Sequence, residues 1–168
     1  MSNQPVIDGL EFARAGAKLR GAWPVAGLPR LRDALCTDEG SLQYELLGMP
    51  EEQGRPVLRL KVGGSLQLVC QRCLGALEFA LHIDVSLQLA ATQAEVDAEP
   101  LEAAGPERIV ASREMPVRDL VEDELLLAIP LAPRHDHCAG REAQAERGSR
   151  EEKSPFADLR GLVGGTKH

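Results

Sequence analysis

Residues 77–89 read LEFALHIDVSLQL, with an apolar side chain at every second position. This alternation gives a β-strand one apolar face, which is buried, and one polar face, which meets water. Shorter runs of the same kind precede it at residues 42–46, 57–62 and 66–70. Because consecutive strands of this kind pair as hairpins, the sequence predicts an antiparallel sheet.

Turn-forming residues separate these strands. Residues 50–56 begin and end with proline and predict a turn. Gly63 and Gly64 stand together between two apolar runs, which predicts a hairpin turn or a bulge. A third break, at Cys70-Gln71-Arg72-Cys73, lies just before the longest strand. We therefore expect these two cysteines at the tip of a hairpin.

The two cysteines have a matching pair later in the chain. His135 and Cys138 repeat the two-residue gap of Cys70 and Cys73. Three thiols and one imidazole are the ligand number and type that tetrahedral zinc prefers, so the sequence predicts one structural zinc ion at this set. His137 is the alternative fourth ligand, but it directly precedes Cys138, so the two side chains project differently.

Two other interpretations of the cysteines stay open. Reduced cysteines also pack as small apolar residues. The pair Cys70 and Cys73 would also serve a thiol oxidoreductase, although such motifs sit at the start of a helix and this one lies between strands. Cys36 has no partner in the pattern and is expected to be a lone buried thiol.

Two helices are expected around the sheet. Residues 8–19 carry apolar side chains at helical spacing, with Asp8 as the N-cap. Residues 117–129 form a second amphipathic stretch between Pro116 and Pro130.

The remaining segments are poor in apolar residues. Residues 92–108 are rich in Ala, Glu and Pro and predict a mobile acidic loop. Residues 139–168 predict a charged tail, with a last short helix beginning at Ser154 and Pro155. We therefore predict a single α+β domain over residues 1–138, in which two or three helices flank the antiparallel sheet.

The charge of the chain is uneven. The net charge is −7; residues 1–75 hold nine Lys and Arg against eight Asp and Glu, and residues 76–168 hold ten against eighteen. An acidic half repels phosphate, so protein partners are expected rather than extensive RNA contact. Four cysteines, no signal peptide and no apolar stretch long enough for a bilayer predict a cytoplasmic protein without a membrane partner.

Two groups of charged residues are candidate contact sites. Asp119, Glu122 and Asp123 form either a solvated helix face or a docking surface for a basic protein partner. A small basic patch on the strands is the candidate RNA contact, although such side chains are commonly exposed singly: Arg55, Arg59, Lys61 and Arg72.

No motif of a known enzyme is present. The chain lacks a glycine-rich phosphate loop, HExxH and G-x-S-x-G. Neighbouring acidic residues fan around a helix instead of converging, so an RNA-cleaving hydrolase has no visible acid–base set. We therefore predict a protein without catalytic activity or a small-molecule substrate.

Three segments resemble one known family. They are LVCQRCL at residues 68–74, DLVEDELLLAIPLAP at residues 119–133, and SPFADL at residues 154–159. Their order and spacing resemble the large ribosomal RNA subunit accumulation protein (YceD) family. The resemblance implies a bacterial cytosolic protein, with organellar relatives in plants, that is needed for accumulation of the 23S ribosomal RNA. It implies a non-catalytic accessory role in ribosome assembly, with assembly proteins or precursor ribosomal RNA as partners.

Overall fold

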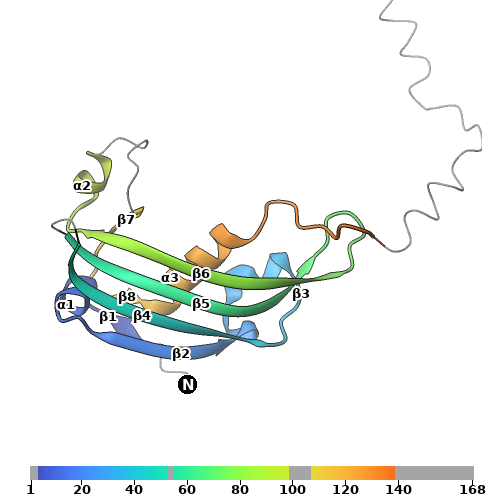
Figure 1. Ribbon diagram of the computed structural model, residues 1–168, viewed down its shortest axis with the longest axis horizontal. Helices are drawn as coiled ribbons and strands as arrows, with labels where there is room; N and C mark the ends of the chain where they lie inside the picture. The colour runs from blue at the N-terminus through green and yellow to red at the C-terminus, as the bar shows by residue number, and fades with distance from the viewer. Residues whose placement is uncertain (1–3, 53–54, 99–106, 139–168) are drawn as a thin grey trace, which may run out of the picture.

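The computed structural model describes residues 4–52, 55–98 and 107–138, which form an α+β fold (Figure 1). Its elements, in chain order, are β1 (Val6–Ile7), α1 (Gly9–Arg14), β2 (Lys18–Pro24), the 3-10 helices η1 (Val25–Gly27) and η2 (Pro29–Ala34), β3 (Leu35–Thr37), β4 (Ser41–Glu52), β5 (Arg55–Val69), β6 (Ala76–Ala90), α2 (Gln93–Asp97), β7 (Glu107–Val110), β8 (Met115–Pro116) and α3 (Val117–Ala128).

One large sheet dominates the molecule. Its strand order is β2-β4-β5-β6-β7, with β3 pairing beside β5. The expected antiparallel pairing is confirmed for β2, β4, β5 and β6. It is wrong for β7, which pairs parallel with β6 because the chain crosses over before it returns. The sheet is therefore mixed and mostly antiparallel.

The predicted alternation of buried and exposed residues is confirmed in much of β5 and β6, but not at the end of β6, where Gln88 is buried along with Leu87 and Leu89. In β5, Leu58 and Leu60 are buried and the intervening Arg59 is exposed. The apolar face of the sheet lies under α3 and η2, which also contact one another. Figure 1 shows α3 lying along this face of the long curved strands. The core thus forms between the sheet and one layer of helices.

The first helix is shorter than the sequence predicts. Asp8 caps α1 as expected, accepting a hydrogen bond from the Glu11 amide at 3.0 Å. The predicted helix over residues 8–19 instead ends at Arg14, because the chain turns at Gly16, where φ is +60°. The following residues form the edge strand β2. Its last residue is Pro24, which has no backbone N–H group and is tolerated on an edge strand.

Gly63 and Gly64 form neither the predicted hairpin turn nor a bulge against β6, with which the register is continuous. Both lie inside β5, which is continuous over fifteen residues. At Gly64, φ is +150° and an added Cβ would lie 2.6 Å from Leu42 Cδ2, so glycine permits the close approach of β4. Most of the turn predicted at residues 50–56 is strand instead, since β4 runs to Glu52 and pairs with β5 from Arg55 onward. Residues 53–54 lie outside the described residues.

The remaining expectations have mixed outcomes. The predicted helix at residues 117–129 is confirmed as α3. The stretch predicted as a loop, residues 92–108, includes α2 and the start of β7 at its two ends. Residues 99–106 and the predicted tail, residues 139–168 with the terminal helix, lie outside the described residues.

Candidate metal centre

The first two candidate ligands lie at the turn between β5 and β6, as the sequence predicts. β5 ends at Val69 and β6 begins at Ala76. The Cys70 amide donates to the Gly75 carbonyl at 2.9 Å, and the Leu74 amide donates to the Cys70 carbonyl at 2.8 Å. Leu74 takes a φ of +62°, the left-handed conformation that closes the turn. This geometry brings both thiols to one side of the hairpin.

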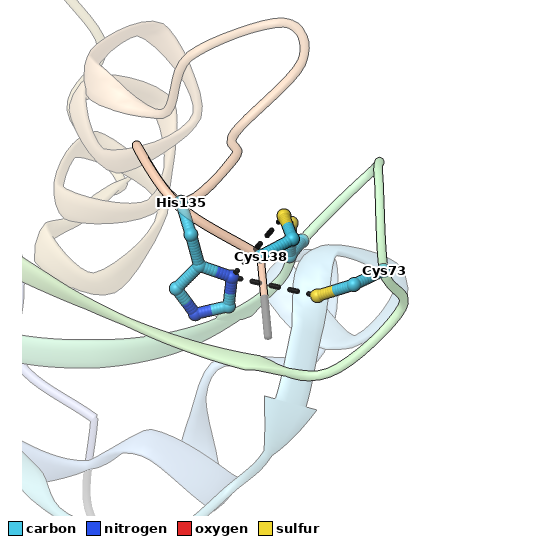
Figure 2. Close-up of side chains that lie close together, drawn as sticks. Cys73, His135 and Cys138 are labelled. Atoms are coloured by element: carbon cyan, nitrogen blue, oxygen red, sulfur yellow. Dashed lines mark hydrogen bonds between the residues drawn. The ribbon is translucent and has the colours of Figure 1, made fainter. Parts of the chain in front are cut away.

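The segment after α3 supplies the other two candidate ligands. The Gln71 amide donates to the Pro133 carbonyl at 2.8 Å, which ties this segment to the hairpin. Pro133 is buried, whereas the neighbouring Leu131 is fully exposed. His135 and Cys138 follow, so they reach the cysteines from the opposite side (Figure 2).

The four side chains converge on one point. Their ligand atoms all lie within 4.8 Å of one another. The Sγ atoms of Cys70 and Cys138 are 3.8 Å apart, and the Nδ1 atom of His135 lies 3.4 Å from Cys73 Sγ and 4.0 Å from Cys138 Sγ. Tetrahedral zinc, with Zn–S of about 2.3 Å and Zn–N of about 2.0 Å, places two sulfurs about 3.8 Å apart and sulfur and nitrogen about 3.5 Å apart. The donor set therefore fits a tetrahedral ion of this size.

A hydrogen bond orients His135 for metal binding. Its Nε2 atom lies 2.9 Å from the Ala76 carbonyl, which accepts only if Nε2 carries the proton. The lone pair is then on Nδ1, which faces the thiols, as a zinc-ligating histidine requires. His137, the alternative ligand, is exposed and is not part of the cluster.

The surroundings of the thiols favour the deprotonated form of one of them. Burial raises the pKa of Cys70, but the backbone N–H groups of Cys73, His135 and Arg72 outweigh burial, and the pKa falls to about 5. Burial and the neighbouring thiols raise the pKa of Cys138. The thiolate is the form that binds metal, so the site holds one ligand ready and would release further protons as a cation enters.

The cluster has the character of a structural site. Cys70 is fully buried and Cys138 is 3% exposed, and all four ligands come from the protein. A catalytic zinc ion needs an open position for water or substrate, whereas four protein ligands close the coordination sphere. The cluster would therefore brace the hairpin against the segment after α3.

Cys36 is not the buried thiol that the sequence predicts. It is exposed in β3, a three-residue strand beside β5. The alternation of this short strand was too brief to predict which of its side chains points outward.

The predicted acidic face of α3 needs one correction. Glu122 is only 1% exposed, because η2 packs over it and the Arg30 amide donates to its carboxylate at 3.0 Å. It therefore lies inside the protein and not on a docking surface. Asp119 and Asp123 keep about half of their side-chain surface in contact with solvent, and Asp123 pairs with the Arg30 guanidinium.

Most of the candidate RNA-contacting residues lie beside carboxylates. Arg59 and Lys61 lie on the exposed face of β5 and both pair with Asp84. Arg55 lies 3.8 Å from Glu95. Arg72 is exposed at the hairpin tip, beyond the end of β5.

Comparison with known proteins supports the sequence resemblance. A family model described as "Large ribosomal RNA subunit accumulation protein YceD" matches residues 58–163. The protein of that name from Haemophilus influenzae (strain ATCC 51907 / DSM 11121 / KW20 / Rd) is 28% identical over 134 residues, which are 79% of this chain and 76% of the relative. No solved structure matches the chain. Among the described residues, no helix has the length and apolar character needed to cross a membrane. Since the family model covers more than half of the sequence, the chain belongs to the large ribosomal RNA subunit accumulation protein YceD family.

Proposed function

We propose that this protein is a non-catalytic accessory factor in the accumulation of large-subunit ribosomal RNA, and that it holds one structural zinc ion. The family supports the first part of the proposal. The convergence of Cys70, Cys73, His135 and Cys138, with separations that fit tetrahedral zinc, is the observation that supports the second part.

A bound zinc ion would join two parts of the chain that lie far apart in sequence. The hairpin tip lies at one end of the long sheet, and the segment after α3 reaches it without regular secondary structure (Figure 1). Structural zinc contributes on the order of 10 kcal/mol in small peptides, so one ion would fix this end of the molecule.

The partners that fit this role are ribosome-assembly proteins or a basic ribosomal protein. Asp119 and Asp123 remain candidates for contact with such a partner because they are exposed on α3. For precursor ribosomal RNA, Arg72 is the best placed candidate, since Arg55, Arg59 and Lys61 each have a carboxylate nearby.

Genetic complementation would test the role in ribosomal RNA accumulation. In a bacterium lacking its own member of the family, expression of this chain should restore the ratio of large-subunit to small-subunit ribosomal RNA. Failure of the folded, metal-loaded protein to change that ratio would contradict the accessory role.

Metal analysis would test the zinc site independently. The purified protein should carry about one zinc ion per chain, and Cys70→Ser should remove it, whereas Cys36→Ser should not. A full complement of metal in Cys70→Ser would exclude the proposed ligand set.

Thiol oxidoreductase activity is the alternative. Cys70 and Cys73 share one turn, and the low pKa of Cys70 would suit a nucleophilic thiol. Thiol titration with and without a chelator separates the two. A reversible Cys70–Cys73 disulfide with a potential near that of cytosolic dithiols would favour the oxidoreductase; chelator-dependent exposure of the thiols with loss of folding would favour zinc.

A further inference from the structure

A second candidate site lies away from the cysteines, between α3 and the edge strand β7. It is a groove of about 310 Å³, called here the α3–β7 groove, and it shares no residue with the metal centre. Its lining residues are Arg30, Leu87, Glu107, Ile109, Leu120, Asp123, Glu124, Leu126 and Leu127.

The floor of the groove is apolar. Leu87 is 1% exposed and Leu120 is 9% exposed, and both belong to the core. At the rim, Leu127 keeps 69% of its surface exposed, so its side chain is available to a partner. Leu120, Glu124 and Leu127 are spaced at i, i+4 and i+7, so one stripe of α3 faces the groove.

The groove also carries an excess of negative charge. Glu107, Asp123 and Glu124 contribute three carboxylates against the single guanidinium of Arg30, which gives a formal charge of −2. Arg30 is already engaged by the Asp123 carboxylate. The two glutamates therefore have no cation of their own within the lining.

Glu124 is the most informative residue of the groove. It is only 7% exposed, yet no described residue donates a hydrogen bond to its carboxylate or forms an ion pair with it. Burial, followed by the charges of Glu107 and Asp123, raises its pKa above the ordinary value for glutamate. Its carboxylate oxygens are not among the fully buried unpartnered atoms, so they are open to the groove and can pair with a positive charge supplied from outside.

We infer that the α3–β7 groove binds a segment of another protein that inserts a lysine or arginine side chain beside a leucine-like side chain. The cation would lie between Glu107 and Glu124, and the apolar side chain would cover Leu127 and the floor. Charge complementarity selects this occupant, because phosphate would be repelled by the same carboxylates. The inference goes beyond the proposed role in ribosomal RNA accumulation and does not require the partner to be ribosomal.

A peptide array would test the inference with the full-length, zinc-replete protein. The probes are nine-residue peptides with two varied positions. One position holds Lys, Glu or Ser, the other holds Leu or Ser, and the distance between them is varied. Peptides that combine Lys with Leu should bind best, and their binding should weaken as salt is added. The double variant Glu107→Gln/Glu124→Gln should bind these peptides on the order of tenfold more weakly or worse, because the cation loses both carboxylates.

Matched variants separate the groove from general acidity. Glu78→Gln removes one carboxylate from an exposed position on β6 and should leave peptide binding unchanged. Leu127→Ser should weaken the binding of Lys–Leu peptides until it approaches the binding of Lys–Ser peptides. Thermal unfolding of each variant establishes that it is folded.

Several outcomes would overturn the inference. They are equal binding of Lys and Glu peptides, no binding of any peptide, or unchanged binding by the double variant. Self-association of the protein that the double variant abolishes would show that the groove binds a second copy instead. Competition for the groove by a ribosomal RNA fragment would make RNA the occupant.

Discussion

Leu74 adopts a backbone conformation that suits glycine better than leucine. Its φ is +62° at the tip of the cysteine hairpin, and its side chain is 72% exposed, so it gains little packing energy there. The left-handed region costs a non-glycine residue about 1–2 kcal/mol. We predict that Leu74→Gly raises the free energy of unfolding by about 1 kcal/mol, measured by chemical denaturation.

The matched control for this prediction is Leu74→Ala. It removes the same side chain but keeps the Cβ atom that opposes a positive φ, so it should give no gain. A stabilisation as large in the alanine variant would assign the effect to the exposed leucine and not to the backbone.

The ionised side chain of Glu124 should make the folded protein less stable at pH 7 than at an acidic pH at which the side chain is protonated. Its pKa is raised in the folded state, so the folded protein binds its proton more tightly than the unfolded chain does. Its contribution to stability is therefore fully present below the unfolded pKa of about 4.3 and is lost as pH rises through the folded pKa. We predict that Glu124→Gln raises the melting temperature at pH 7.

The pH dependence identifies the cause. The difference between Glu124→Gln and the original protein should shrink as pH falls toward 4, where the glutamate is itself protonated. A difference that stays constant between pH 4 and pH 7 would show that the ionised carboxylate is not the destabilising group.

Residue patterns predicted the four metal-ligand candidates, but they did not predict that two glutamates of α3 are buried. Their paired two-residue spacing was visible in the sequence, and the fold brings all four together. Glu122 and Glu124 both read as polar helix residues. Both are buried in the structure. The cover over Glu122 comes from η2, whose Arg30 amide reaches it from ninety-two residues away in sequence. Helical periodicity carries no information about such distant contacts.

At the scale of elements, α1 packs so closely on β4 that it depends on a glycine. An added Cβ at Gly48 would lie 2.3 Å from the Phe12 carbonyl oxygen and 2.8 Å from Ala13 Cα. These are backbone atoms, so α1 would have to move. We predict that Gly48→Ala destabilises the protein by about 1–3 kcal/mol, measured by chemical denaturation.

Gly63 provides the comparison. An added Cβ there meets nothing within 4 Å. Gly63→Ala in β5 should be neutral or stabilising by less than about 1 kcal/mol, because it restricts the unfolded chain. Equal losses in both variants would mean that the α1–β4 contact is not the cause.

The elements differed in how far the sequence predicted them. β6 was predicted because its apolar residues alternate over a long stretch, and α3 because prolines bound it. β5 was predicted as two shorter strands, because Gly63 and Gly64 in its middle resemble a turn. β2 was not predicted, and its first two residues were included in a predicted helix because Ala17 and Leu19 fit helical spacing. β7 has only four residues, and its parallel partner is set by a crossover, which no local pattern records.

At the scale of the whole molecule, metal removal should destabilise the end that holds the cysteine hairpin and leave the rest of the sheet folded. Chelation should lower the melting temperature and increase hydrogen exchange first at the β5–β6 turn and at residues 133–138, where the four ligands lie. The paired centres of β4 and β5 should stay protected. Hydrogen exchange with mass spectrometry measures both regions in one experiment.

The reverse pattern would contradict a local metal brace. If chelation exposed the whole sheet at once, the ion would be needed for folding everywhere. If it changed neither region, the cluster would hold reduced cysteines packed without metal.

Cys70 and Cys138 are separated by sixty-eight positions in sequence and meet through their sulfur atoms. An ion shared by them would convert β6, β7 and α3 into a closed ring of polypeptide. A single backbone cut anywhere inside that ring would then release no fragment, because both new ends would stay tethered through the metal. Clipped protein should therefore migrate as one particle until a chelator opens the ring and lets the two pieces part under mild denaturant.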